Sequence, residues 1–166
     1  MSYACDRRGF SIIERAPYYQ NIMLMDIDPC RPLRIPWRAV VIQPAILYVE
    51  SNLLLAQLVT DLLDLARFHV WRADDGWTAQ MFLRHEQRFA LLLIDNELRD
   101  TSGLAVVTYA RTLAHRESLP IILFSIEDCE QEAKAAGANE FLRKPHDLYL
   151  LLDMIRRLIG AGVEKR

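Results

Sequence analysis

The sequence predicts an α/β fold, a doubly wound parallel sheet of five strands with helices on both faces. From residue 45 onward a short apolar run is followed by a longer segment with helical spacing, and this unit recurs along the chain. The runs at 90–94 and 121–124 are apolar at every position, as expected of parallel strands that helices cover on both sides. Both observations favour a parallel sheet.

The expected strands and helices alternate strictly. The strands are expected at 46–49, 69–73, 90–94, 121–124 and 140–142, and the helices at 52–67, 77–88, 104–115, 127–136 and 147–159. Asn52 is placed to cap the first helix, while Gly137 and Gly160 are placed to end the fourth and the last.

Two of these helices carry apolar side chains that are expected to face the core, with a dimer or partner surface as the alternative. They are Leu55, Leu58, Val59, Leu62 and Leu65 in the first helix and Tyr149, Leu150, Leu152, Met154 and Ile155 in the last.

Residues 1–44 differ from the rest, because they hold five of the seven prolines. We expect an irregular or poorly ordered N-terminal extension, in which local preferences favour at most a strand at 38–42 or a helical turn at 11–15. Residues 45–160 are expected to form the regular domain, and 161–166 a C-terminal tail.

Composition excludes several classes of protein. A formal net charge of −2 gives no electrostatic reason to expect direct nucleic-acid binding. No apolar run is long enough to cross a membrane, and the N-terminus lacks the pattern of a secretion signal. The three cysteines show no paired spacing for zinc or thiol exchange, so a cytoplasmic location is expected.

Polar side chains follow the expected strands at the edge where a doubly wound sheet binds its ligands. They are Glu50, Ser51 and Asn52 after the first strand, Asp95, Asn96 and Glu97 after the third, Ser125 after the fourth, and Lys144 and Pro145 after the fifth.

These residue types suit an aspartate that accepts a phosphoryl group. Such an aspartate needs a positive side chain and hydroxyl donors for the phosphoryl oxygens, and Asp95, Lys144 and Ser125 match these needs. Carboxylates nearby would favour a hard cation such as Mg²⁺, with Asp95, Glu50 and Glu97 as candidate ligands.

At this point the sequence resembles the receiver domains of bacterial two-component response regulators, from about residue 45 to residue 159. The resemblance depends on motifs that are weak singly but specific in their order and spacing. They are the first strand and acidic pair at 46–52, the turn at 73–76, the acceptor motif at 93–95 with Gly103 beyond it, the fourth strand at 120–125, and the segment 136–145.

The resemblance implies a flavodoxin-like sheet with strand order 2-1-3-4-5 and a phosphoryl group carried on Asp95. It assigns Lys144 to phosphate binding, Ser125 and Phe141 to a conformational switch, and a cis peptide bond to Pro145. It also implies a sensor histidine kinase or phosphotransfer protein as donor, and a downstream protein as target.

The sequence departs from the family pattern near the acceptor. Ser51 stands where the family commonly has an aspartate that ligates the metal, and Glu50 or Glu97 would have to compensate. Leu98 and Arg99 replace the common methionine and proline of the loop.

Other functions remain open. The departure at Ser51 favours a pseudo-receiver that binds partners without phosphorylation. A flavin site would need a Ser/Thr/Gly-rich loop at 50–53, and an aspartate-based phosphatase of the haloacid-dehalogenase type would need an aspartate at Glu97. The remaining interpretation assigns no chemistry to these residues: Asp95 and Ser125 would be capping residues, and Lys144 a solvated turn residue.

Overall fold

Five strands form one parallel sheet. The computed structural model describes residues 43–163, so the strand considered at 38–42 and the turn at 11–15 lie outside the described residues. The strands lie in the order β2-β1-β3-β4-β5, and each neighbouring pair is parallel. Their bounds are β1 Ala45–Val49, β2 His69–Ala73, β3 Leu91–Asp95, β4 Ile121–Ser125 and β5 Glu140–Arg143. The expected strand order is confirmed.

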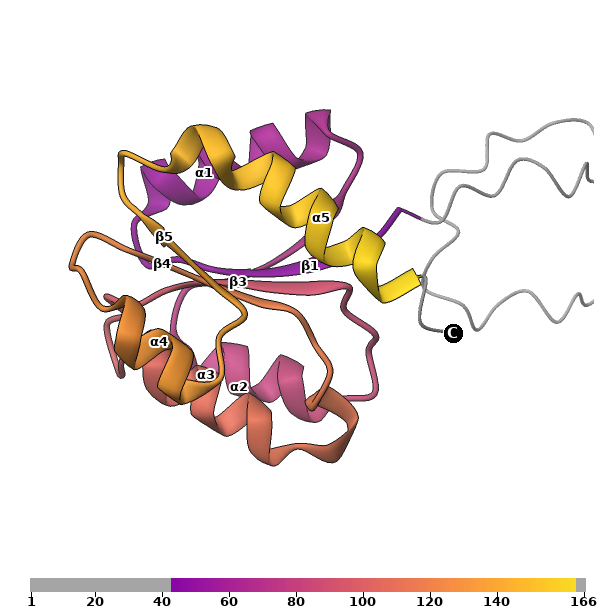
Figure 1. Ribbon diagram of the computed structural model, residues 1–166, viewed down its shortest axis with the longest axis vertical. Coiled ribbons are helices and arrows are strands. Elements are labelled where there is room, and N and C mark those ends of the chain that lie inside the picture. Colours follow the sequence, from indigo (N-terminus) through magenta and orange to yellow (C-terminus); the bar gives the residue numbers. More distant parts are fainter. Residues whose placement is uncertain (1–42, 164–166) are drawn as a thin grey trace, which may run out of the picture. The chain divides into compact units, whose positions relative to one another are not determined.

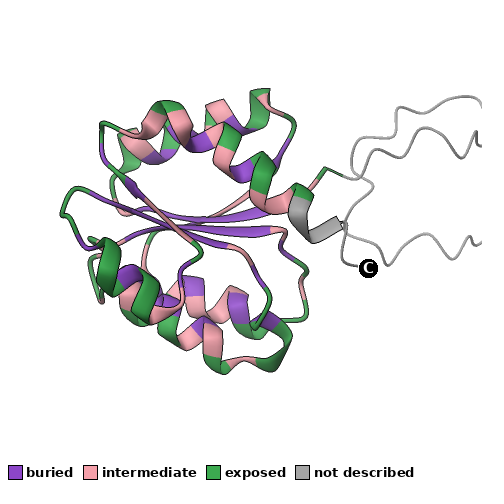
Figure 2. Cartoon of the chain, viewed as in Figure 1, coloured by how far each residue is buried: buried purple, intermediate pink, exposed green. Residues whose placement is uncertain are grey.

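Helices cover both faces of this sheet. Helices α1 and α5 lie on one face, and α2, α3 and α4 lie on the other (Figure 1). Their bounds are α1 Leu53–Leu65, α2 Gly76–Arg84, α3 Gly103–Thr112, α4 Glu130–Ala136 and α5 Leu151–Val163, with short 3₁₀ turns at Ala114–Arg116 and Leu148–Leu150. Strands β3 and β4 are consequently buried at every residue (Figure 2).

The core consists of two apolar layers, one on each face of the sheet. Successive side chains of a strand point to opposite faces, so alternate residues of one strand enter different layers. In β1, Leu47 and Val49 pack on the side of α2, α3 and α4, whereas Ile46 and Tyr48 pack on the side of α1 and α5. In β3, Leu93 lies in the layer under α1 and α5, so Asp95, two residues later, points to the same side of the sheet.

Two of the three expected caps are present. The side chain of Asn52 accepts hydrogen bonds from the amides of Leu54 and Leu55, and Gly137 ends α4 with a φ of 100°. The expected stop at Gly160 is wrong, because α5 continues to Val163. Gly160 has no positive φ, and a glycine within a helix lowers its stability by only about 1 kcal/mol. The expected tail therefore begins inside a helix.

Three helices are shorter than expected, and near the end of α2 the backbone carbonyls have partners outside the helix. Helix α2 ends at Arg84, and the carbonyls of Leu83, His85 and Gln87 accept hydrogen bonds from the buried guanidinium of Arg116. Helix α4 begins at Glu130 rather than 127, and a turn precedes it in which the carbonyl of Glu127 accepts a hydrogen bond from the amide of Cys129. Helix α3 likewise ends at Thr112, before the 3₁₀ turn.

The apolar stripe expected on α1 is only partly correct. Val59 is buried, but Leu58 and Leu65 are exposed, and the remaining buried positions are Ala56 and Leu63. Leucines occupy so much of this helix that more than one face satisfies helical spacing, and the contact with the sheet selects one of them. In the last segment Ile155 is buried, as expected, whereas Tyr149 is exposed.

Candidate functional site

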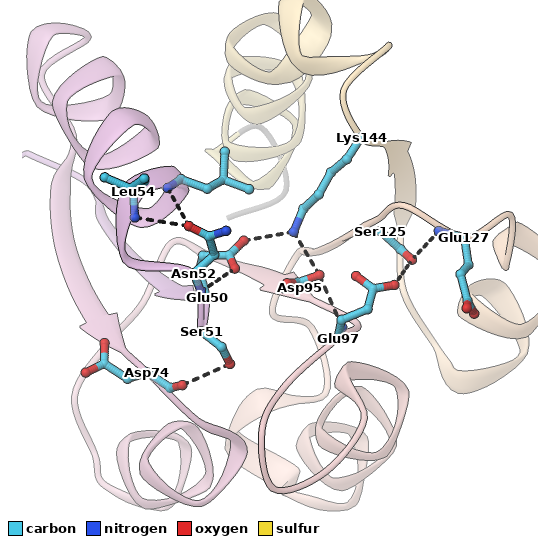
Figure 3. A network of polar contacts seen from close by, with 11 residues as sticks. Glu50, Ser51, Asn52, Leu54, Asp74, Asp95, Glu97, Ser125, Glu127 and Lys144 are labelled. Atoms are coloured by element: carbon cyan, nitrogen blue, oxygen red, sulfur yellow. Dashed lines mark hydrogen bonds and ion pairs between the residues drawn. The ribbon is translucent and has the colours of Figure 1, made fainter.

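Four polar side chains meet at the carboxyl edge of the sheet. Asp95 and Ser125 are the last residues of β3 and β4, and Glu50 and Lys144 directly follow β1 and β5 (Figure 3). Glu50 is 2% exposed, Asp95 4% and Lys144 7%, and Ser125 is fully buried. Charged groups are rarely this buried unless they are paired, so their partners determine what the site can do.

Lys144 lies between the two buried carboxylates. Its Nζ is 2.8 Å from Oε2 of Glu50 and 2.8 Å from Oδ1 of Asp95. The ammonium also lies 5.0 Å from the ring centroid of Phe124, over the aromatic face. Two carboxylates facing one ammonium leave a net negative charge at this edge of the sheet. The cluster is therefore suited to attract a further cation.

The start of α1 fixes Glu50. Oε1 of Glu50 accepts a hydrogen bond from the amide of Asn52 at 2.9 Å, while Asn52 itself caps the helix. Two residues earlier, Tyr48 is fully enclosed, and its hydroxyl has no hydrogen-bond partner among the described residues. Burial raises the pKa of Tyr48, and the charge of Glu50 raises it further. The tyrosine therefore stays neutral beneath Glu50.

The loop between β3 and α3 packs tightly against the backbone of Asp95. A Cβ at Gly103 would lie 2.2 Å from the carbonyl oxygen of Asp95, so a side chain cannot fit there. The amide of Gly103 bonds to the carbonyl of Asn96, and Oδ1 of Asp95 accepts from the amide of Glu97 at 3.2 Å. Glycine at this position therefore allows the loop to pack against the end of β3.

Ser125 is bonded to Glu97. Its Oγ donates to Oε1 of Glu97 at 2.6 Å and accepts from the amide of Glu127 at 3.0 Å (Figure 3). Partial burial raises the pKa of the Glu97 carboxyl, and the neighbouring Asp95 raises it further. The two glutamates considered as metal ligands therefore have different surroundings, because Glu50 contacts Lys144 and Glu97 contacts Ser125.

Ser51 does not join this cluster. Its hydroxyl donates to the backbone carbonyl of Asp74 at 3.1 Å, and its side chain points away from Lys144 (Figure 3). Its carbonyl accepts a hydrogen bond from Nη2 of Arg99 at 2.9 Å. The position that departs from the family pattern therefore helps to hold the loop that contains Arg99.

A pocket of about 360 Å³ opens over the cluster. It is lined by Glu50, Ser51, Asn52, Leu55, Asp95, Glu97, Ile126 and Lys144. Its donor atoms are carboxylate and carbonyl oxygens, which suit Mg²⁺. Within residues 43–163, as the side chains stand, no three His, Cys, Asp or Glu residues form a group that could hold a metal ion. A cation would therefore be bound mainly by Glu50 and Asp95, with water completing its shell.

The other predicted site residues lie nearby but outside the pocket lining. The Lys144–Pro145 peptide bond is cis. Phe141 is partly buried and packs against the apolar layer under α2, α3 and α4. The structure thus brings together Asp95, Lys144, Ser125 and both glutamates. It places Phe141 on the face of the sheet opposite to that of Asp95 and Lys144.

Three contacts near the site were not predicted from the sequence. They are the hydrogen bond between Glu97 and Ser125, the bond from Arg99 to Ser51, and the pairing of the Asp100 carboxylate with the amides of Gly76 and Trp77. Only the last had a signal in the chain, because an acidic residue can bond to free amides at a helix start.

The model of the response regulator receiver domain matches residues 46–156, which is more than half of the chain. The chain belongs to this family. Receiver domains are signalling domains rather than typical enzymes. The polar-differentiation response regulator DivK of Brucella anthropi is 25% identical over 119 residues, covering 70% of this chain and 96% of the relative.

Solved structures of receivers share this fold. The chemotaxis response regulator CheY4 of Vibrio cholerae superposes with a TM-score of 0.65 at 28% identity, covering 70% of this chain and 98% of that one. The receiver domain of a sensor histidine kinase from Pseudomonas aeruginosa also has a TM-score of 0.65, at 25% identity, covering 71% and 98%. That structure has a magnesium ion coordinated in its active-site cleft. In the described part of our receiver, no helix is both long and apolar enough to cross a membrane.

Proposed function

We propose that this receiver accepts a phosphoryl group on Asp95 from a histidine kinase or phosphotransfer protein. The observation that carries the proposal is the contact between Lys144 and Asp95 at the floor of an open pocket, with the Ser125 hydroxyl in the same polar cluster. An acceptor carboxylate, a fixed positive charge and a hydroxyl donor are the groups that phosphoryl transfer to an aspartate requires.

The transfer forms one bond and breaks one. Both contacts described for Asp95 are made by Oδ1, so we take Oδ2 as the attacking oxygen. Oδ2 forms a bond to phosphorus while the phosphorus–nitrogen bond of the donor phosphohistidine breaks, and the imidazole takes up a proton. Lys144 then neutralises charge on the phosphoryl oxygens. Bound Mg²⁺, held by Asp95 and Glu50 and assisted by Glu97, would supply further neutralisation of those oxygens.

The surroundings of the pocket support a protein as donor. Ile126 lines the pocket and is 64% exposed, and Leu54 and Leu58 are exposed on α1. Apolar side chains gathered in the open are typical of protein-binding surfaces. We therefore propose a sensor kinase or phosphotransfer protein as donor and a protein as downstream target. The unpaired spacing of the three cysteines supports our proposal of the cytoplasm as location. Alternatively, a second copy of this chain could cover the same face of α1 and form a homodimer.

The test is phosphorylation of the full chain by acetyl phosphate with Mg²⁺, followed by intact-mass spectrometry. The unmodified protein and Asp153→Asn, which changes an exposed carboxylate on α5, should gain one phosphoryl group. Asp95→Asn should gain none, because the amide is a poor nucleophile. Beryllofluoride with Mg²⁺ should bind the same proteins that acetyl phosphate modifies.

The second candidate is a pseudo-receiver that binds partners without phosphorylation. It is favoured by Ser51, which supplies no carboxylate and turns its hydroxyl to Asp74. A cation would then have fewer charged ligands than a second acidic residue would provide. Absence of both acetyl phosphate modification and beryllofluoride binding at saturating Mg²⁺ would leave this candidate alone.

A further inference from the structure

The hydroxyl of Ser125 already has an acceptor in the unphosphorylated receiver. Ser125 donates to Oε1 of Glu97 at 2.6 Å, and no part of its side chain is exposed. A serine hydroxyl carries a single proton, so it can donate fully to only one acceptor at a time. A phosphoryl oxygen on Asp95 would need this same proton.

The carboxylate of Glu97 resembles a phosphoryl group in its chemistry and in its place. It follows Asp95 by two residues, and Figure 3 shows it between Asp95 and Ser125. It presents negatively charged oxygens to a hydroxyl donor, and the positive charge of Lys144 favours this ionised form. Hydrogen bonds to an ionised acceptor are about twice as strong as those between neutral groups.

The hydrogen bond also orders the segment that follows β4. Oγ of Ser125 accepts from the amide of Glu127, and α4 begins only at Glu130. Whatever holds the Ser125 side chain therefore also holds the backbone at Glu127. A phosphoryl oxygen on Asp95 and the carboxylate of Glu97 would therefore fix this segment in the same way, by accepting the hydrogen bond of the Ser125 hydroxyl.

We propose that Glu97 is an internal substitute for the phosphoryl group. Before phosphorylation, Glu97 keeps Ser125 and the segment up to Glu127 in the arrangement that a phosphoryl group on Asp95 would hold. The inference rests on the proposed function for the role of Ser125 as donor to the phosphoryl group. Phosphorylation would have to displace Oε1 of Glu97 from Ser125, so the segment should change little when Asp95 is modified. Oε2 of Glu97 would remain for a cation.

The first experiment needs no phosphodonor. Amide hydrogen exchange of the full chain is followed by NMR in four proteins: unmodified, Glu97→Ala, Glu97→Gln and the control Glu132→Ala, which removes an exposed glutamate of α4. Exchange at Glu127 should rise roughly tenfold in Glu97→Ala, because Ser125 loses its acceptor. It should rise less in Glu97→Gln, whose amide oxygen still accepts, and stay unchanged in Glu132→Ala.

Exchange at Leu123, in the buried strand β4, serves as the control for folding. If Glu97→Ala also exposes Leu123, the comparison is made in Glu97→Gln, where a rise confined to Glu127 supports the inference. Unchanged exchange at Glu127 in the folded variant would overturn it.

A second experiment separates the inference from the proposed function. Beryllofluoride with Mg²⁺ should slow the exchange of Glu127 in Glu97→Ala back toward the unmodified value, while changing the unmodified protein by less than about twofold. Beryllofluoride that binds the unmodified protein and alters Glu127 strongly would contradict the inference. Failure to bind any variant would contradict the proposed function, and the first experiment would still decide the role of Glu97.

Discussion

The ammonium of Lys144 reaches Asp95 across strand β4. Asp95 ends β3 and Lys144 directly follows β5, and these two strands are not neighbours in the sheet. The Lys144 side chain passes over the ring of Phe124 to bring Nζ within 2.8 Å of Oδ1. A long, straight side chain over an aromatic face accounts for a contact between strands that share no hydrogen bonds. It also makes Lys144 the main counter-charge for two buried carboxylates.

Lys144→Met should lower the free energy of unfolding by about 3 kcal/mol, because Glu50 and Asp95 would then face each other without a positive charge. Mg²⁺ should restore part of this loss and should stabilise the variant more than the unmodified protein. Urea denaturation with and without Mg²⁺ measures both effects. Lys134→Met, which removes an exposed ammonium, is the control for net charge. Equal responses to Mg²⁺ in both variants would show that Lys144 does not neutralise a cation site.

Gly103→Ala should destabilise the domain by about 2 kcal/mol, because its Cβ would meet the backbone of Asp95 and Asn96, which cannot move aside easily. Acetyl phosphate modification should slow as well. The matched control is Gly160→Ala in α5, where a Cβ meets nothing within 4 Å. There alanine should stabilise by up to about 1 kcal/mol. Thermal unfolding compares the two variants, and changes of the same sign would contradict this explanation of Gly103.

The Asp100 carboxylate should stabilise the domain at neutral pH and lose this effect in acid. Hydrogen bonds from the amide of Gly76, joined by Trp77, lower the pKa of Asp100 below its usual 3.8. The unfolded chain therefore binds a proton more readily, and the contribution is complete above about 3.8 and disappears as pH falls through the lower, folded value. Because Asp100 is exposed, Asp100→Asn should cost no more than about 1 kcal/mol at neutral pH.

Urea denaturation from neutral pH to about pH 3 tests this dependence. The stability difference between Asp100→Asn and the unmodified protein should shrink toward the acid end. Glu86→Gln, which changes an exposed carboxylate in a loop, should show no such convergence. A difference that stays constant with pH would mean that Asp100 acts through packing rather than charge.

Leucines of α1 should differ sharply in their effect on stability. Leu63 is fully buried, so Leu63→Ala should cost about 2–5 kcal/mol. Leu65 is 83% exposed, so Leu65→Ala should change stability by less than about 0.5 kcal/mol. Equilibrium unfolding measures both variants. A large loss in Leu65→Ala would instead indicate that this leucine is covered by another surface in solution.

The fold could be predicted from the sequence because alternating apolar runs and helical segments leave few arrangements of a parallel sheet. The site could be located for the same reason, since strand ends bring Asp95, Ser125 and Lys144 to one edge. The side-chain partners could not be predicted. Nothing in the residue types shows that Ser125 bonds to Glu97 rather than to Asp95, because rotamers and loop geometry determine that choice.

The ends of the helices could also be predicted only in part. The stop at Gly160 fails because glycine permits a left-handed cap but does not require one, and α5 continues to Val163. The end of α2 depends on Arg116, which lies far along the chain and donates hydrogen bonds to backbone carbonyls near the end of that helix. Local preference carries no information about such a distant donor.

The loop from Asp95 to Gly103 is attached at both ends and in the middle. Arg99 reaches the carbonyl of Ser51, Asp100 bonds to the start of α2, and Gly103 packs on the backbone of Asp95. One residue inserted or deleted would separate at least one of these pairs. Relatives that keep these attachments should therefore tolerate exchanges of residue type in this loop far better than a change in its length.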